Sequence, residues 1–307
     1  MIPKTRYHSN PLEPSELIVT EQGAIYHLNL RPHEIAETIL VVGDQNRVER
    51  VSRHFDTIEH KIENREFVTH TGRIGKCELT VMSTGIGCDN IDIVVNELDA
   101  LANIDLESRL INKDPKSLNI IRLGTSGALQ EDIPVDSFVV STHGLGFDGL
   151  LNFYETTPSD QELAIQNAFV QQTGWSDDLN PIYVAKGSSK LIEQIGEGMT
   201  PGITATAHGF YGPQGRSLRM SPKINELNQK LRQFEYLGHR VTNFEMETSA
   251  LYGLSGSLGH QACTVCAIIA NRFKKEYSKD YKSTVDLLIQ NVLEKLTNKQ
   301  GSVEKNV

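Results

Sequence analysis

The sequence lacks several features that mark special classes of protein. It holds only four cysteines among 307 residues, too few for a fold held together by disulfides. It also lacks a long apolar stretch. Residues 262–270 are a short run that includes a threonine, whereas a membrane helix needs about 20 apolar residues. We therefore predict a protein that does not cross a membrane.

An excess of positive charge is also missing. The 39 acidic residues outnumber the 30 Lys and Arg residues, which gives a net charge of −9. Such a chain is a poor candidate for coating nucleic acid, so any anion that it binds must meet a local cluster of basic residues. The first residues, Met1–Arg6, do not contain the apolar core of a signal peptide, and we expect a cytoplasmic protein.

What is present is the patterning of an α/β fold. Short apolar runs such as 38–42 and 119–123 are typical of buried strands, and each ends at a glycine-containing turn. Between them, apolar residues recur at helical spacing, as in 91–102. This alternation predicts a largely parallel or mixed sheet within one domain. We assign residues 1–23 to an irregular arm, 24–297 to the domain and 298–307 to a polar tail.

Several other segments carry local predictions. Residues 66–70 and 78–83 are predicted to be paired strands, and 135–141 a further strand. Residues 105–118 and 143–159 are predicted to be loops, the second because it is rich in glycine. Cys263 and Cys266 lie in an apolar run that is typical of a buried strand, where they would point to opposite faces. We therefore expect buried thiols and no metal site.

Two strand ends combine glycine with arginine, in 43–47 and in 122–127. Glycine allows backbone N–H groups to approach a ligand closely, and arginine supplies a rigid fork of donors for an oxyanion. Ligand sites in such sheets lie at the carboxyl ends of strands. A single arginine of this kind usually forms a surface ion pair, but two at neighbouring strand ends favour a phosphate site.

Residues 124–128 nearly match the serine nucleophile motif G-x-S-x-G, with Ala128 in place of the last glycine. A serine hydrolase with Ser126 as nucleophile therefore stays open as a second class of function. The segment 210–216 packs two aromatic residues, a tight turn, Gln214 and Arg216 into seven positions, which suits the edge of a planar heterocycle. The segment 243–248 is predicted to open a helix, with carboxylates that complement the helix dipole or accept hydrogen bonds from sugar hydroxyls.

Taken together, these motifs resemble the nucleoside phosphorylase-I family and, within it, the uridine phosphorylases. The resemblance runs from about Ala24 to Arg272. It rests on an ordered set of six motifs: Tyr26-His27-Leu28, Gly43-Asp44-Gln45-Asn46-Arg47-Val48, Arg65-Glu66-Phe67, Arg122-Leu123-Gly124-Thr125-Ser126-Gly127, Phe210 to Arg216, and Asn243-Phe244-Glu245-Met246-Glu247.

The resemblance implies a three-layer α/β/α domain with a central mixed sheet, and reversible phosphorolysis of uridine to uracil and ribose 1-phosphate. The positions that match phosphate-binding residues are Gly43, Arg47, Arg65, Arg122 and Thr125. Those that match ribose contacts are His27, Thr125, Met246 and Glu247, and those beside the base are Phe210, Gln214 and Arg216. Arg47, Arg122, Arg216 and Glu247 are the implied catalytic set.

The resemblance also implies a homodimer as the minimal unit, because members lend the residues matching His27 and Arg65 to the neighbouring subunit. Assembly into a hexamer is left open. Inorganic phosphate is the co-substrate, and we expect no cofactor and no catalytic metal. Some relatives hold a monovalent cation at the dimer interface through a glutamate, and Glu66 occupies that position.

The sequence departs from the family pattern at three places. Gln45 replaces the proline of the first loop, and Gly87-Cys88-Asp89-Asn90 replaces Gly-Gly-Pro-Ser. Purine-acting relatives carry an aspartate near the end of a late strand, where this chain has Ala270-Asn271-Arg272. That difference favours a pyrimidine. The alternatives are a phosphorylase of thymidine or of a purine nucleoside, a nucleosidase that uses water, and a nucleoside-binding protein without activity.

Overall fold

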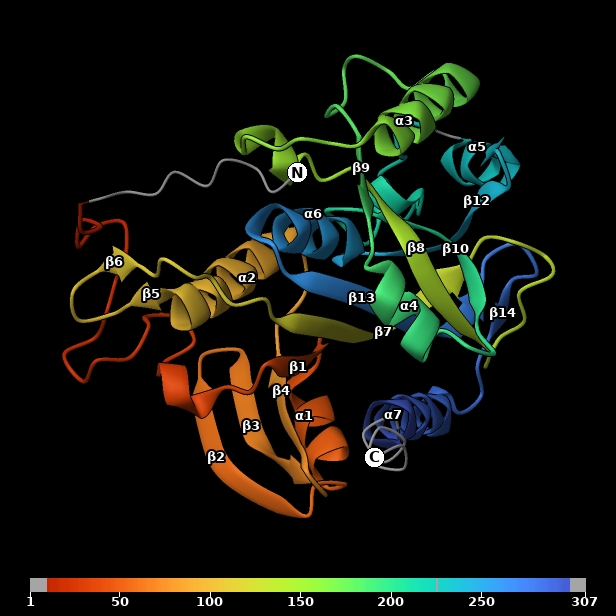
Figure 1. Ribbon diagram of the computed structural model, residues 1–307. Helices are drawn as coiled ribbons and strands as arrows, with labels where there is room; N and C mark the ends of the chain where they lie inside the picture. Colours follow the sequence, from red (N-terminus) through yellow and green to blue (C-terminus); the bar gives the residue numbers. More distant parts are fainter. Residues whose placement is uncertain (1–9, 225, 299–307) are drawn as a thin grey trace, which may run out of the picture.

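The computed structural model describes residues 10–224 and 226–298, and one large mixed sheet dominates this part of the chain (Figure 1). The strands are β1 (Thr38–Val42), β2 (Thr57–Asn64), β3 (Phe67–Ile74), β4 (Cys77–Ser83), β7 (Asn119–Ala128), β8 (Phe138–Gly146), β9 (Tyr183–Lys186), β10 (Thr200–Thr206), β11 (Glu235–Tyr236), β12 (His239–Glu245), β13 (Gln261–Asn271) and β14 (Glu276–Tyr277). A separate small hairpin pairs β5 (Ile104–Asp105) with β6 (Leu110–Ile111).

The helices are α1 (Gln45–Ser52), α2 (Cys88–Asn103), α3 (Asp160–Thr173), α4 (Ser189–Ile195), α5 (Leu227–Gln233), α6 (Thr248–Leu258) and α7 (Tyr281–Asn298), with short 3-10 turns η1 (Pro32–Glu34), η2 (Leu150–Phe153) and η3 (Gly212–Gln214).

The main strands follow the order β11-β12-β10-β8-β13-β7-β1-β4-β3-β2, with β9 paired to β8 and β14 to β13. β1 runs parallel to β4 and β7, and β13 runs parallel to β7 but antiparallel to β8. The mixed sheet is therefore confirmed. The end of β12 also pairs with the end of β7, through Phe244 opposite Gly127. This extra pairing closes β7, β13, β8, β10 and β12 into a ring.

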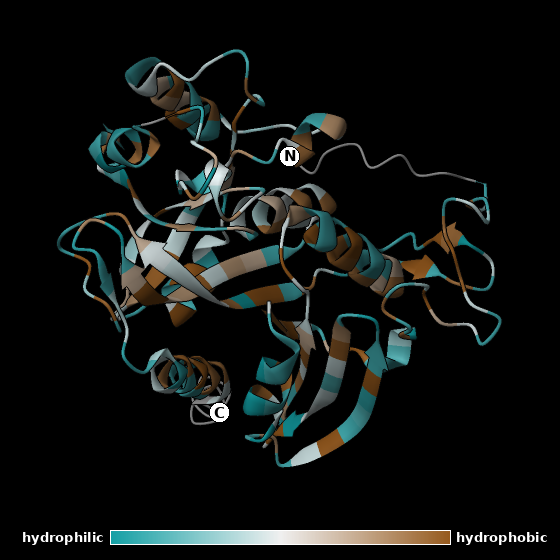
Figure 2. Ribbon diagram, turned by 180° about the vertical axis from the view of Figure 1, so that it is seen from behind, coloured by the Kyte–Doolittle hydropathy of each residue, from teal (hydrophilic) through white to brown (hydrophobic). Residues whose placement is uncertain are grey.

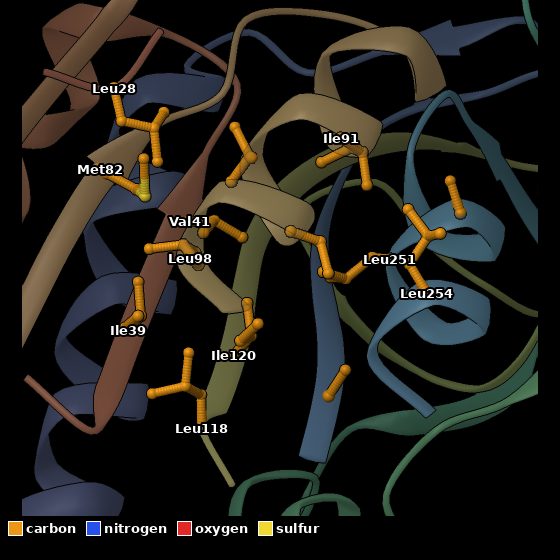
Figure 3. Close-up of a cluster of buried hydrophobic side chains, with 14 of the residues drawn as sticks. Leu28, Ile39, Val41, Met82, Ile91, Leu98, Leu118, Ile120, Leu251 and Leu254 are labelled. Carbon is orange, nitrogen blue, oxygen red and sulfur yellow. The ribbon is translucent and has the colours of Figure 1, made fainter. Parts of the chain in front are cut away.

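Successive side chains of a strand point to opposite faces of the sheet. Because both faces of the central parallel strands are covered, every position needs an apolar residue, which explains the continuous apolar runs. Ile39 and Val41 of β1 belong to one core cluster, together with Ile91 of α2 and Leu251 of α6 (Figure 3). Leu40 and Val42, which point the other way, belong to a second cluster that includes residues of α1 and α7.

Helices thus cover both faces of the central strands. Figure 1 shows α2 and α6 on one side and α1 and α7 on the other. Hydropathy colouring agrees with this arrangement, since the central strands and α2 carry long hydrophobic stretches (Figure 2). The three-layer α/β/α domain is confirmed. A further cluster of Phe147, Phe169, Phe234 and Phe244 fills the space between the ring of strands and helices α3 and α5.

The helix boundaries follow from local capping. Asp44 accepts a hydrogen bond from the backbone N–H of Asn46 at 3.0 Å, so α1 begins just after it. Ser159 and Glu162 form a reciprocal capping box at the start of α3, and Gly174 ends that helix in the left-handed conformation (φ 56°).

The predicted loop at 143–159 was wrong in its first part, because β8 continues to Gly146. The glycines there serve close packing inside the sheet. A Cβ atom added at Gly144 would lie 2.6 Å from the Cα of Ser249, and one at Gly146 would lie 2.4 Å from the Tyr183 ring. Only glycine permits these contacts with α6 and β9.

Other boundaries also differ from the predictions. The segment 243–248 does not open a helix at its start. Residues 243–245 end β12, and α6 begins only at Thr248. The predicted loop 105–118 contains the hairpin strand β6. The paired strands near 66–83 are confirmed as β3 and β4, with Gly72 inside β3 and the turn at Gly75 (φ 56°).

Residues 10–23 of the predicted arm contain no helix, and the arm packs onto the hairpin of β5 and β6. The backbone N–H of Leu12 donates to the carbonyl of Arg109 at 2.9 Å, and the Arg109 guanidinium donates to the carbonyl of Leu17. No helix in the described residues has the length and apolar content needed to span a membrane. Residues 1–9 of the arm and 299–307 of the predicted tail lie outside the described residues.

Candidate active site

The loops that follow β1 and β4 meet, and α1, which follows the first of them, lies against β7. The prediction that the run 119–123 ends at a glycine turn was wrong, because β7 continues to Ala128 and residues 122–127 lie within the strand. Arg47 lies in the first turn of α1 and is buried, and its Nη1 donates to the carbonyl of Leu123 in β7 at 3.0 Å. Burial and the nearby positive charge of Arg122 both lower the pKa of Arg47. A Cβ atom at Gly43 would lie 3.5 Å from the carbonyl oxygen of Gly85, so the loops after β1 and β4 touch.

The Nε of Arg47 is a buried donor without a hydrogen-bond partner among the described residues. An unmet donor of this kind is costly inside a protein. Because the charge of Arg122 lies close by, this corner of the site carries two buried guanidinium groups. Thr125, three residues after Arg122 in β7, is half-buried. The arrangement suits an anion with several oxygens.

Arg122 is held by two carboxylates from the start of α6. Its Nη2 donates to Glu247 and lies 3.4 Å from Oε2 of Glu245. Burial alone would lower the pKa of the Arg122 guanidinium, but the two carboxylates more than offset it, so the pKa is raised. Arg122 therefore stays charged, and it joins the arginine corner to the junction between β12 and α6.

Glu247 is buried and points into this junction. Its Oε1 accepts a hydrogen bond from the backbone N–H of Gly87 at 2.8 Å, and Gly87 (φ 102°) adopts a conformation that favours glycine. The preceding residue, Met246, is half-buried, and its carbonyl accepts from the Cys88 thiol at 3.2 Å. The starts of α2 and α6 are thus bound to each other through Met246 and Glu247.

Glu245 was quoted within a motif but was given no role. It accepts hydrogen bonds from Thr206 Oγ1 at 2.7 Å and from the backbone N–H groups of Glu247 and Thr248 at 3.0 Å. Burial and the neighbouring Glu247 raise the pKa of its carboxyl, against the opposing effect of Arg122. Glu245 therefore fixes the backbone on which Glu247 is carried. A carboxylate in front of a helix was the only signal for this role.

The predicted base-binding segment folds around the turn η3. Gln214 is buried, and its Oε1 accepts from Arg216 Nη1 at 2.6 Å. The same Nη1 donates to the carbonyl of Phe210 at 2.5 Å, and the guanidinium stacks 3.7 Å above the Phe210 ring. The structure therefore brings Phe210, Gln214 and Arg216 together. Arg216 and Tyr211 also line an adjoining cavity of about 620 Å³ whose wall includes Trp175.

Arg272 is a second residue that sequence reasoning left without a role. It follows β13 and is largely buried, and burial together with the positive charge of Arg216 lowers its pKa to about 10. Its backbone N–H donates to the carbonyl of Ala128 at 2.9 Å. Its position at the end of a strand, next to Asn271, was the feature of the sequence that could have indicated a role in the site.

The His27 side chain is half-buried and the Arg65 side chain is exposed. The carbonyl of Arg65 accepts from Gln45 Nε2 at 2.9 Å, so its backbone adjoins the start of α1. Nδ1 of His27 lies 2.6 Å from Oε1 of Glu97, and Arg65 Nη2 lies 3.4 Å from the Tyr26 hydroxyl. Asn64 joins the two positions by donating to the carbonyl of His27 at 2.7 Å. No described hydrogen bond joins the side chains of His27 and Arg65 to Arg47 or Arg122.

Ser126 does not form the arrangement that a serine hydrolase needs. It lies inside β7 rather than at a strand-to-helix turn, and its Oγ accepts from Asn243 Nδ2 at 2.9 Å. Cys263 and Cys266 are confirmed as buried thiols of β13, where burial raises their pKa values to about 12 and about 11. In residues 10–224 and 226–298, no cluster of three or more His, Cys, Asp or Glu side chains is placed to hold a metal ion.

Comparison with known proteins identifies the family. Residues 37–298 match the model of the phosphorylase superfamily. The chain is 30% identical over 270 residues to the uridine phosphorylase of Thermococcus kodakarensis, covering 85% of this chain and 82% of the relative. A purine nucleoside phosphorylase of the DeoD type from Buchnera aphidicola is 23% identical over 87% of this chain and 97% of its own length.

Among solved structures, the chain is similar to a Trypanosoma brucei nucleoside phosphorylase that shows uridine phosphorylase activity. The TM-score is 0.84 at 30% identity, over 92% of this chain and 99% of that one. The family match, the relatives and the shared fold agree. The chain therefore belongs to the phosphorylase superfamily, and it is a nucleoside phosphorylase, a pentosyltransferase.

Proposed function

We propose that the enzyme cleaves uridine with inorganic phosphate to give uracil and ribose 1-phosphate, reversibly. The observation that carries this proposal is the shared boundary between two subsites. Arg122 contacts both Arg47's corner and Glu247, so an anion held by the arginines would lie next to a sugar held by Glu247. Glu247 would accept hydrogen bonds from the 2′- and 3′-hydroxyls, and Thr125 and Met246 would complete the ribose site.

Catalysis in this proposal rests on positioning and electrostatics. Breaking the N-glycosidic bond builds positive charge on the ribose and negative charge on the leaving base. Phosphate held by Gly43, Arg47, Arg122 and Thr125 attacks the sugar, and its charge stabilises the developing cation. Arg216 and Gln214 would stabilise charge on the uracil carbonyl oxygens, with Phe210 beside the ring. No covalent enzyme intermediate is needed.

Asn271 supports a pyrimidine over a purine. Its amide nitrogen donates to the carbonyls of Gln130 and Ile133, both at 2.8 Å, and its Oδ1 accepts from the N–H groups of Phe273 and Lys274. The side chain is therefore fully engaged in holding the loop after β13. Its amide is not an acid that could protonate a leaving purine, and its N–H groups are already used, so they do not donate to the base either.

The same proposal makes a homodimer the minimal active unit. His27 would be lent to the ribose and Arg65 to the phosphate of the partner's site. Arg65 is exposed, and the hydrogen bonds described for both side chains go to residues outside the arginine corner, which favours this arrangement. Glu66 would hold a monovalent cation at that interface.

The test is release of uracil from uridine, followed by chromatography with and without phosphate. Phosphate-dependent release of uracil and ribose 1-phosphate is expected. Equal release without phosphate would make the enzyme a nucleosidase instead. Turnover of inosine or thymidine in place of uridine would keep the phosphorylase chemistry but refute the assignment of the base.

A further inference from the structure

Asp148 lies just beyond the end of β8 and gathers several hydrogen bonds that the proposed chemistry does not use. The Tyr183 hydroxyl donates to its carboxylate, 2.7 Å from Oδ1 and 2.9 Å from Oδ2. The Ser249 hydroxyl donates to Oδ2 at 2.9 Å, and the backbone N–H of Leu150 donates to Oδ1 at 2.8 Å. These donors come from β9, α6 and η2, so one carboxylate ties three elements to the end of β8.

Ser249 is the point at which this carboxylate reaches the active site, because it lies in the first turn of α6. Its backbone N–H donates to Thr206 Oγ1 at 3.0 Å, and its Cα packs against Gly144 with no room for a side chain there. The Tyr183 hydroxyl lies 3.0 Å from the Ser249 hydroxyl, and the Tyr183 ring covers Gly146. The start of α6 is therefore clamped onto β8.

The start of α2 meets the same carboxylate through Cys88. Burial, reinforced by the Asp148 carboxylate, raises the pKa of the Cys88 thiol, so the group stays protonated and acts as a donor. Cys88 also contacts the carbonyl of Met246, and its neighbour Gly87 donates to Glu247. Ser249 at the start of α6 thus bonds to Asp148, and Cys88 at the start of α2 lies near it.

We propose that Asp148 is a positioning residue, which locks the starts of α2 and α6 against each other so that Glu247 keeps the orientation needed for the ribose hydroxyls. It acts through Ser249 and Cys88 and does not touch the reacting atoms. This inference rests on the proposed role of Glu247 in binding ribose. The phosphate positions Gly43, which follows β1, and Arg47, which lies in α1, are outside the contacts of Asp148.

The two substrates should therefore respond differently to the loss of Asp148. In Asp148→Asn, which keeps the size of the side chain, we expect kcat/KM for uridine to fall by about 10- to 100-fold, the range known for residues that orient a functional ligand. The KM for phosphate should rise much less than the KM for uridine, because Gly43 and Arg47 keep their positions and only Arg122 shares a contact with Glu247. The loss of kcat/KM should be smaller with 2′-deoxyuridine, since this nucleoside lacks the 2′-hydroxyl that would donate a hydrogen bond to Glu247.

The experiment compares wild-type enzyme, Asp148→Asn, Ser249→Ala and the double variant with both nucleosides at varied phosphate. If Asp148 acts through Ser249, the two substitutions should be strongly non-additive. Asp136→Asn is the matched control. Asp136 also accepts two hydroxyl donors, from Ser278 at 2.5 Å and Thr284 at 2.6 Å, but it anchors α7 far from Glu247. The Asp136→Asn substitution should lower the melting temperature and leave the KM values for nucleoside and phosphate unchanged.

Equal losses with uridine and 2′-deoxyuridine, or a parallel rise in the KM for phosphate, would overturn the inference. So would a variant that is less stable but has wild-type kinetics, because that result would leave Asp148 a purely structural role. These failures occur while the wild-type enzyme cleaves uridine with phosphate. If the wild-type enzyme does not, the proposed function fails first and the inference falls with it.

Discussion

Arg47 and Arg122 are both buried at the same corner of the site, yet they are balanced differently. The Arg47 guanidinium makes one described hydrogen bond, to a backbone carbonyl, and keeps an unpartnered Nε. Arg122 is the counter-ion of two buried carboxylates. Removal of Arg47 should therefore affect mainly the binding of the ligand, whereas removal of Arg122 also leaves Glu245 and Glu247 without a partner.

Variants at the two positions should separate catalysis from stability. Arg47→Met is expected to lower kcat/KM for phosphate by on the order of 10²-fold, as for the loss of one oxyanion donor, with little change in the free energy of unfolding. Arg122→Met should lose activity and also about 3–5 kcal/mol of stability, the cost of breaking a buried ion pair. Phosphate kinetics and urea unfolding check both. Unchanged phosphate dependence in Arg47→Met would contradict the assignment.

The pair Gln214 and Arg216 should control only the base. Gln214→Ala or Arg216→Ala is expected to raise the KM for uridine and lower kcat while the KM for phosphate stays near normal, because neither side chain contacts the arginine corner. Arg219→Ala, an exposed arginine in the same segment, is the control. Steady-state kinetics with each substrate varied would test this. A phosphate-specific defect in either variant would refute it.

The roles of single residues could be predicted from the sequence where the residue type alone limits the possible chemistry. Arg47 could be selected because it follows a strand and a glycine turn, and Arg122 because it stands close to Gly124 at the end of an apolar run, although β7 continues to Ala128. Glu245, Asp148 and Arg272 could not, because their roles depend on which donors or charges surround them after folding. A carboxylate that caps a helix and one that binds a sugar look the same in sequence.

Strand β8 shows how an element can be misjudged from its glycines. Glycine weakens the case for a strand, and three glycines in 143–149 favoured a loop. In the folded chain Gly144 and Gly146 are the places where α6 and the Tyr183 ring come closest to the sheet. The apolar strands could be predicted because burial on both faces requires an apolar residue at nearly every position. A close approach between two elements leaves no mark in the sequence other than the glycine itself.

Two glycine substitutions should therefore have opposite effects. Gly144→Ala would place a methyl group against the backbone of Ser249, displacing α6 and with it Glu247. We expect lower stability and a large loss of nucleoside affinity. Gly256→Ala, in an exposed position of the same helix with open space around it, should stabilise the protein by about 0.5–1 kcal/mol without affecting kinetics. Thermal melts and uridine kinetics measure both. A fully active Gly144→Ala enzyme would contradict the packing argument.

For the whole molecule, the proposed sharing of Arg65 between subunits predicts a site completed by a second copy of the chain. We expect a dimer or larger assembly in sedimentation. We also expect that Arg65→Ala and Arg47→Met enzymes, each poorly active alone, regain activity when co-expressed, because a hybrid dimer contains one site with both arginines intact. Co-expression of two differently tagged copies of Arg47→Met is the control. A fully active monomer, or no recovery in the hybrids, would refute the shared site.

The closure of the strand ring, by pairing of β12 with the end of β7, has a consequence for how the enzyme matures. Residues 127–128 and 243–244 are remote in the chain, and such contacts form slowly because a long loop must close first. Arg122 and Thr125 lie on one side of that seam and Glu245 and Glu247 on the other. We therefore expect helical structure to return early during refolding, while competence to turn over substrate arrives only in the final, slowest phase.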